Sequence, residues 1–166
     1  MSINNTLLLY YSITGQDKAA FMYAEKYNKY IAENPILSLQ QTYRSAYAYK
    51  QVGRDQEAEF LFNRQIKYDT EALELGRYLS RFGAAHYDLA AVYAFLGDRA
   101  KAYEHLREFN KKHTYPLWWV TLIKNDPLFN SIRDEPEFLQ IVRDVEAKYL
   151  TEHERVRLWL EENDLL

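Results

Sequence analysis

Hydrophobic residues along this chain recur three and four positions apart, as Leu89, Tyr93 and Leu96 do. This spacing places side chains on one face of an α-helix and predicts helices through most of the sequence. The 166 residues include only 5 glycines and 4 prolines. A many-stranded β fold needs turn residues about every 8–12 positions, so this composition argues against one. The pattern therefore predicts an all-α protein.

Three of the glycines lie in a repeated frame, with a tyrosine four residues before and an alanine five residues after. The three copies are Tyr11–Gly15–Ala20, Tyr49–Gly53–Ala58 and Tyr93–Gly97–Ala102. A glycine in the left-handed conformation ends a helix, and an aspartate shortly after it can cap the next helix. The expected caps are Asp17, Asp55 and Asp98. Each copy therefore predicts a helical hairpin, and such hairpins bury their apolar sides by stacking in series.

The third copy carries most of the tetratricopeptide repeat (TPR) motif, which spans about 34 residues. The matching residues are His86, Leu89, Ala90, Tyr93, Gly97, Ala102 and Leu106. Residues 1–116 resemble this family, although the glycines of successive copies are 38 and 44 residues apart. The resemblance implies an α–α superhelix of about three hairpins. We expect the additional residues to lengthen the second helix of the first two copies, most of all around Asp69–Ser80.

Residues 117–166 depart from the repeat and are expected to cap the array within the same structural domain. A short apolar helix is predicted over Pro116–Ile123, and two later prolines follow acidic residues that can occupy N-cap positions. These acidic residues are Asp126, Asp134 and Glu135. This part resembles the ending that closes TPR arrays in many bacterial regulatory proteins. We expect Phe129, Ile132 and Phe138 to fill the open end, because terminal repeats need a cap.

The final helix is predicted to run from Pro136 to Glu162, with a seam of coiled-coil type along it. The seam residues are Phe138, Val142, Val145, Tyr149, Glu152, Val156 and Trp159. This helix would span about 40 Å, against about 23 Å for a repeat helix, so its end should overhang the array or fold back on it. Two interpretations stay open. The end packs on its own chain, or Val156, Trp159 and Leu160 pair with a second chain to form a homodimer.

The resemblance also implies that the first helix of each hairpin lines a concave side that binds a protein or peptide partner. The candidate partner-binding residues are Leu9, Gln40, Tyr43, Arg44, Tyr47, Lys50, Tyr87, Asp88 and Phe95. Tyrosine combines a wide apolar contact area with a hydroxyl group, which suits it to binding peptides. The alternative is that these tyrosines fill gaps between hairpins or pack against the C-terminal segment.

Charge and composition narrow the choice of partner. The formal net charge is −3, so no global basic field would attract nucleic acid. The charge is uneven, because residues 73–124 carry eight basic and five acidic groups, whereas residues 125–166 carry five and eleven. No apolar run is long enough to span a membrane. Because the chain has no cysteine, disulfides and thiolate sites are excluded.

The sequence contains none of the residue patterns that indicate an enzyme or a metal site. It has no glycine-rich phosphate loop and no nucleophile elbow, and its histidines lack the spacing of a metal-binding motif. His86 occupies a packing position of the third repeat, so we expect it to be at least partly buried. Trp118 and Trp119 point about 100° apart on a helix, so one should be buried and the other half exposed. We therefore expect no catalytic residue, no metal and no cofactor.

These observations predict a non-enzymatic protein–protein interaction scaffold or sensor. The resemblance implies a C-terminal module of a larger, cytoplasmic bacterial protein that acts in signalling or transcription. Two alternatives stay open. One is an oligomerisation module that uses the final helix and whose concave side is filled by its own chain. The other is a small-ligand-sensing domain with a tyrosine-lined pocket.

Overall fold

The computed structural model describes residues 3–34, 41–77 and 83–165, and within these ranges it contains helices and no strand. The helices are α1 (Ile3–Ile13), α2 (Asp17–Glu33), α3 (Thr42–Gln51), α4 (Asp55–Glu74), α6 (Ala84–Leu96), α7 (Arg99–Asn110), α8 (Leu117–Asn125), the 3-10 helix η1 (Pro127–Phe129) and α9 (Pro136–Glu162). The all-α prediction is confirmed, and so are the predicted bounds of the final helix.

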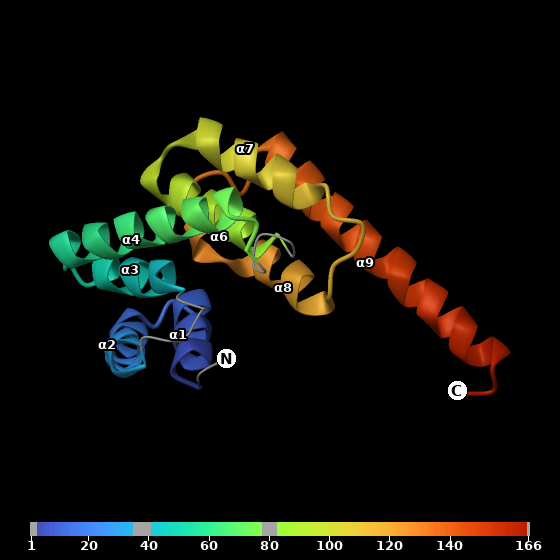
Figure 1. Ribbon diagram of the computed structural model, residues 1–166, viewed down its shortest axis with the longest axis horizontal. Helices are drawn as coiled ribbons and strands as arrows, with labels where there is room; N and C mark the ends of the chain where they lie inside the picture. Colours follow the sequence, from blue (N-terminus) through green and yellow to red (C-terminus); the bar gives the residue numbers. More distant parts are fainter. Residues whose placement is uncertain (1–2, 35–40, 78–82, 166) are drawn as a thin grey trace.

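Three helical hairpins follow one another along the chain (Figure 1). They are α1–α2, α3–α4 and α6–α7, and in each the two helices pack closely together. Between hairpins, α2 packs on α3 and α4 packs on α6, so that each hairpin contacts the next one in sequence. The hairpins are therefore arranged in series, which is the arrangement that the repeated glycine frame predicts.

The three predicted glycine turns have one geometry. Gly15, Gly53 and Gly97 have φ angles of 68°, 76° and 85°, in the left-handed region that favours glycine. In each turn the amide after the glycine donates a hydrogen bond to the carbonyl of the tyrosine four residues before it, as Asp98 does to Tyr93 at 2.9 Å. This bond closes a Schellman motif. The repeated spacing of tyrosine and glycine therefore marks the last turn of each first helix.

The predicted aspartate caps are confirmed only in the third hairpin. There Asp98 is the N-cap of α7, and its side chain accepts a hydrogen bond from the Lys101 amide at 3.2 Å. Asp17 and Asp55 are instead the first residues of α2 and α4, and among the described residues neither helix has a side-chain cap. In every hairpin the N-cap is the residue directly after the glycine, and only the third hairpin has an aspartate there.

The additional residues of the first two copies lie in their second helices, as expected. α2 has 17 residues and α4 has 20, whereas α7 has 12. α4 ends before Gly76, which has a φ angle of 58° and closes another turn of the same kind. The residues from 78 to 80 of the predicted extension lie outside the described ranges.

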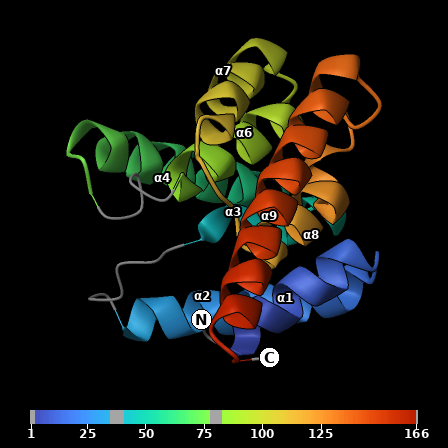
Figure 2. The same cartoon turned by 90° about the vertical axis from the view of Figure 1, so that its right-hand side faces the viewer.

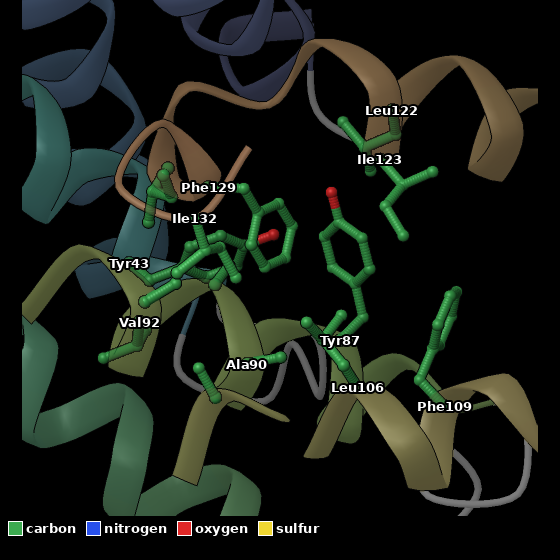
Figure 3. Close-up of a cluster of buried hydrophobic side chains, with 14 of the residues drawn as sticks. Tyr43, Tyr87, Ala90, Val92, Leu106, Phe109, Leu122, Ile123, Phe129 and Ile132 are labelled. Atoms are coloured by element: carbon green, nitrogen blue, oxygen red, sulfur yellow. The ribbon is translucent and has the colours of Figure 1, made fainter. Parts of the chain in front are cut away.

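The segment after the hairpins packs on α6 and α7 and reaches α3 through Asp126. We call residues 117–149, which comprise α8, η1 and the first half of α9, the closing segment. Phe129, Ile132 and Phe138, which were predicted to fill the open end of the array of hairpins, are each at most 1% exposed. Phe129 contacts Tyr87 of α6 edge-on, with ring centroids 5.4 Å apart. Figure 3 shows Tyr87 between Phe129 and Ile132 on one side and Leu122 and Ile123 on the other.

The remaining half of α9 extends past the other helices. We call residues 150–162 the projecting half. In Figure 1 it is the red end of the longest helix, and Figure 2 views the molecule from the side on which α9 lies. Among the described residues, Lys148 is the last side chain of α9 that bonds to another helix, at Asn110 of α7. The sequence predicted that this end either overhangs the array or folds back on it, and the structure shows that it overhangs the array.

Candidate functional sites: the covered α3–α6 face and the projecting half of α9

The predicted partner-binding residues do not form one open surface. Tyr43, Arg44, Tyr47, Tyr87 and Asp88 are buried, each at most 8% exposed. The prediction that these five side chains face an open groove is therefore wrong. For Arg44 and Tyr87 the physical reason is that the closing segment packs against them through Asp126, Trp119 and Phe129, as the alternative interpretation of the tyrosines proposed.

The other four candidates are separate from this buried group. Leu9 and Phe95 are partly buried at the edge of the main core, and the Phe95 ring lies 5.5 Å from that of Tyr47. Lys50 is exposed at the end of α3 and pairs with Asp55 at 3.0 Å. Gln40 lies outside the described residues.

A buried ion pair fastens the closing segment to the hairpins. Arg44 of α3 is 3.2 Å from Asp126, which directly precedes η1, and their side chains are 3% and 0% exposed. The Tyr87 hydroxyl of α6 donates a hydrogen bond to the same Asp126 oxygen at 3.0 Å. The other Asp126 oxygen accepts the Leu128 amide at 3.2 Å and caps η1. Asp126 is thus the predicted cap, and it also joins three parts of the fold.

Two further carboxylates are buried near this pair. Asp69 of α4 accepts a hydrogen bond from Gln65 at 2.8 Å, and Gln65 in turn accepts the Thr42 amide at the start of α3. Burial raises the pKa of Asp69 to about 9, and repulsion from Asp88 adds to this shift. Burial likewise raises the pKa of Asp88 to about 7, although Arg44 opposes it.

Asp88 is also incompletely paired. Its Oδ1 atom and the Tyr43 hydroxyl have no hydrogen-bond partner among the described residues. Buried polar groups without a partner cost stability, and such groups are commonly satisfied by an ordered water. Asp69 and Asp88 are at most 5% exposed, so this cluster is not accessible from the surface, and the hydrogen bonds of Gln65 join α3 to α4.

The prediction that one of the two adjacent tryptophans is buried and the other half exposed is confirmed at the outer edge of the closing segment. Trp119 is 5% exposed and packs on Tyr87, with ring centroids 4.5 Å apart. Trp118 is 55% exposed and stacks on Trp119 at 4.2 Å. One tryptophan is therefore part of the core, and its neighbour is a surface residue.

The projecting half of α9, unlike the buried residues described above, has apolar side chains that are exposed to solvent. Val156 is 40% exposed and Trp159 is 52% exposed, although both continue the seam that is buried at Phe138 and Val145. Leu160 is half-buried. The ion pairs that described residues make in this half all lie within α9, and they join Glu152 to Arg155, Glu154 to Arg157, and Arg157 to Glu161. Such pairs stabilise an isolated helix, because partners three or four residues apart share a face.

Sequence reasoning missed the residues that interact over long distances along the chain. Arg44 and Asp126 are 82 positions apart, and no local pattern predicts that they meet. The same holds for Gln65, which caps α3 from the middle of α4. The role of Asp126 as a cap was predicted from the proline that follows it, because that role is local.

Neither a metal cluster nor a membrane helix is evident in the part of the chain that the structure describes. No group of three or more histidine or carboxylate side chains there is placed to hold a metal ion. None of the helices described combines the length and the apolar character that crossing a membrane requires. Comparisons with protein-family models, with curated proteins and with solved structures find no match to this chain.

Proposed function

We propose that this chain is a non-enzymatic protein–protein interaction module of TPR-like hairpins that self-associates through the projecting half of α9. The observation that carries the proposal is the seam along α9. The same apolar stripe is covered at Phe138 and Val145 and uncovered at Val156 and Trp159. An exposed stripe at this spacing is typical of a helix that pairs with another helix.

The burial of five candidate partner-binding residues on α3 and α6 supports the choice of surface. A peptide that bound there would have to displace the closing segment, including the buried pair of Arg44 with Asp126. Breaking such a pair by removing one partner costs about 3–5 kcal/mol, which is a large part of a domain's stability. The projecting half is accessible without any such cost.

A second copy of this chain is the occupant that the geometry favours. Two antiparallel α9 ends that cross at Val156 would place Trp159 of each copy beside His153 of the other, and both side chains are exposed. A twofold contact of this kind uses the same patch on both subunits. The projecting half covers about 20 Å of helix, so the interface is smaller than the ~1,200 Å² of a stable complex, and we expect a weak dimer.

Charge gives the proposal a distinct salt dependence. Residues 150–165 carry five acidic and two basic groups, for a net charge of −3. Two such ends repel each other, and salt screens this repulsion. Self-association should therefore strengthen as salt is added, whereas binding of a basic partner should weaken.

Sedimentation equilibrium over a wide range of protein concentration tests the proposal. We expect a monomer–dimer equilibrium in the wild type and a monomer in Trp159→Ser. Trp118→Ser is the matched control, because Trp118 and Trp159 are exposed to similar extents, 55% and 52%. A wild type that stays monomeric at every concentration, or a dimer weakened equally by both substitutions, would refute the proposal.

The wider setting is proposed from resemblance alone. Residues 126–138 resemble the closing segment of TPR arrays in bacterial regulatory proteins, so we propose that the module belongs to a cytoplasmic regulator. In that setting, pairing of α9 would bring two copies of the regulator together. The same sedimentation measurement on the full regulator, with and without Trp159→Ser, tests this extension.

A further inference from the structure

The first helix of the first hairpin exposes positions that the third hairpin buries. Ile3, Leu7 and Tyr10 lie 12, 8 and 5 residues before the turn glycine, and this spacing places them on one side of α1. Ile3 is 74% exposed, Leu7 is half-buried and Tyr10 is 55% exposed. We call these three residues the α1 outer face. The residues at the same positions of α6 are each at most 1% exposed, and they are Ala85, Leu89 and Val92.

In the second hairpin, the preceding hairpin covers the position that corresponds to Tyr10. This position of α3 is Ala48, which is fully buried. α2 packs on α3, and α4 packs on α6 in the same order. Ala48 belongs to the same buried cluster as four residues of α2, namely Ala20, Ala24, Tyr27 and Ile31. The place of the α1 outer face in the repeat therefore fits a helix of the α2 type.

We infer that the α1 outer face is a docking site for an amphipathic helix of another protein. That helix presents alanine and larger apolar residues three and four positions apart, as the buried stripe of α2 does, and no charge. Residues Ile3–Ile13 include no charged side chain, whereas every other α-helix described here has at least one. A charge buried against this uncharged face would lack a partner, which costs stability, so the docking helix is uncharged on that side.

The Tyr10 ring is positioned by a row of aromatic side chains. It contacts the Tyr11 ring edge-on, with ring centroids 5.2 Å apart, and the Tyr11 ring stacks on Tyr23 of α2 at 5.4 Å. Because this row restricts the Tyr10 ring, little conformational entropy is lost when a partner binds. Tyrosine is enriched among the residues that dominate binding energy at interfaces. Tyr10 is therefore the expected anchor of the contact.

A second copy of this chain does not offer a free helix of the α2 type. The second helices α2, α4 and α7 each pack on the next part of their own chain, namely α3, α6 and α9. The end of α9 is uncovered, but residues 150–165 carry a net charge of −3, which does not suit an uncharged face. The partner is therefore a different protein. Figure 1 shows α1 well separated from the projecting half, so that the two contacts can form together.

Binding of a helical peptide with the α2 sequence tests the inference. The probe is a labelled peptide of Asp17–Glu33, cross-linked between side chains of its polar face because short helices are only marginally stable in water. Fluorescence anisotropy follows its titration with the Trp159→Ser protein, in which pairing through α9 is removed. We expect saturable binding, weakened about tenfold or more when Tyr10→Ser is added. Circular dichroism establishes that each variant is folded.

Phe60 of α4 provides the matched control, since it is also an exposed aromatic residue, at 66%. Phe60→Ser should leave binding unchanged, and a probe with Ala24→Glu should not bind, because a charge then lies on its apolar stripe. The inference is overturned if the probe does not bind, or if Tyr10→Ser and Phe60→Ser weaken binding equally. It is also overturned if the Trp159→Ser protein self-associates and Tyr10→Ser abolishes this, because the occupant is then a second copy.

Discussion

The two halves of α9 have the same apolar seam and opposite environments. Phe138 and Val145 in the first half are at most 1% exposed, whereas Val156 and Trp159 in the second half are 40% and 52% exposed. The first half lies against α7 and α8, and the second extends past them (Figure 1). Hydrophobic periodicity therefore predicts that a helix forms, and the length of the neighbouring helices decides which part of it is covered.

The two halves are also stabilised by different kinds of interaction. The closing segment depends on the pair of Arg44 with Asp126, which joins residues 82 positions apart. The projecting half depends on pairs three and four residues apart, such as Glu154 with Arg157. Long-range buried pairs hold a fold together, whereas local pairs hold a helix together without reference to the rest of the molecule.

The largest expected effect comes from breaking the buried pair. Asp126→Ala leaves the Arg44 guanidinium buried without its partner and removes the acceptor of the Tyr87 hydroxyl. We expect the free energy of unfolding to fall by about 3–5 kcal/mol. Urea denaturation followed by circular dichroism measures this change.

A surface pair between the same parts of the fold provides the control. Glu137 of α9 pairs with Arg107 of α7 at 2.7 Å, and both side chains are largely exposed. Glu137→Ala should leave the urea midpoint nearly unchanged, because water screens exposed pairs. Replacing both buried partners, as Arg44→Met with Asp126→Leu, should recover most of the lost stability. If Asp126→Ala has no larger effect than Glu137→Ala, the closing segment is not held by this pair.

The second prediction is that the buried carboxylates of α4 and α6 and the exposed glutamates of the projecting half affect stability with opposite pH dependence. Burial raises the pKa of Asp69 to about 9 and that of Asp88 to about 7 in the fold, above the ordinary value of about 4. The folded state therefore binds these protons more tightly than the unfolded state does. The stability that they contribute is complete at about pH 4 and is lost as the pH rises through 7 towards 9.

In the projecting half, the stability that the carboxylates contribute changes with pH in the opposite direction. Arg155 and Arg157 lower the pKa of Glu152 and Glu154 in the helix. Their contribution is present at neutral pH and is lost as the pH falls through these lowered values. The free energy of unfolding, measured by urea denaturation, should decrease between pH 5 and pH 9 in the wild type, by at most ~1.4 kcal/mol per pH unit for each proton, and less steeply in Asp69→Asn. A midpoint that rises over this range would contradict the assignment.

Local patterns predicted the local features of the fold. The frame of tyrosine, glycine and alanine predicted the three hairpins because helix ends depend on residues within one turn. The prolines after Asp126 and Glu135 predicted where η1 and α9 begin for the same reason. The prediction of the N-caps failed at Asp17 and Asp55, because the N-cap in each case is the residue directly before the aspartate.

The candidate site could not be predicted in the same way. Arg44 and Tyr87 were expected to face a partner, and both contact Asp126 in the closing segment of their own chain. A tyrosine-rich concave side has the same composition whether a peptide or the chain itself covers it. The pairing of His86 with His105 depends on how α6 lies against α7, and periodicity does not determine this.

The smallest expected effect tests whether the projecting half is stabilised mainly by its own sequence. Arg157→Ala removes two ion pairs, with Glu154 and Glu161, and leaves the apolar stripe intact. Amide hydrogen exchange in residues 150–162, measured at a concentration where the protein is monomeric, should become about two- to fivefold faster. Exchange in residues 136–149 should not change, because that half is held by packing against α7 and α8 and opens only with the rest of the fold.

Arg107→Ala is the control for this measurement, since it removes an exposed arginine that pairs with the packed half. It should leave exchange in the projecting half unaltered. If the amides of residues 150–162 exchange as slowly as those of residues 136–149 in the wild-type monomer, then something in the chain covers the projecting half. That result would remove the difference between the two halves, and with it the reason for assigning Val156 and Trp159 to a second copy.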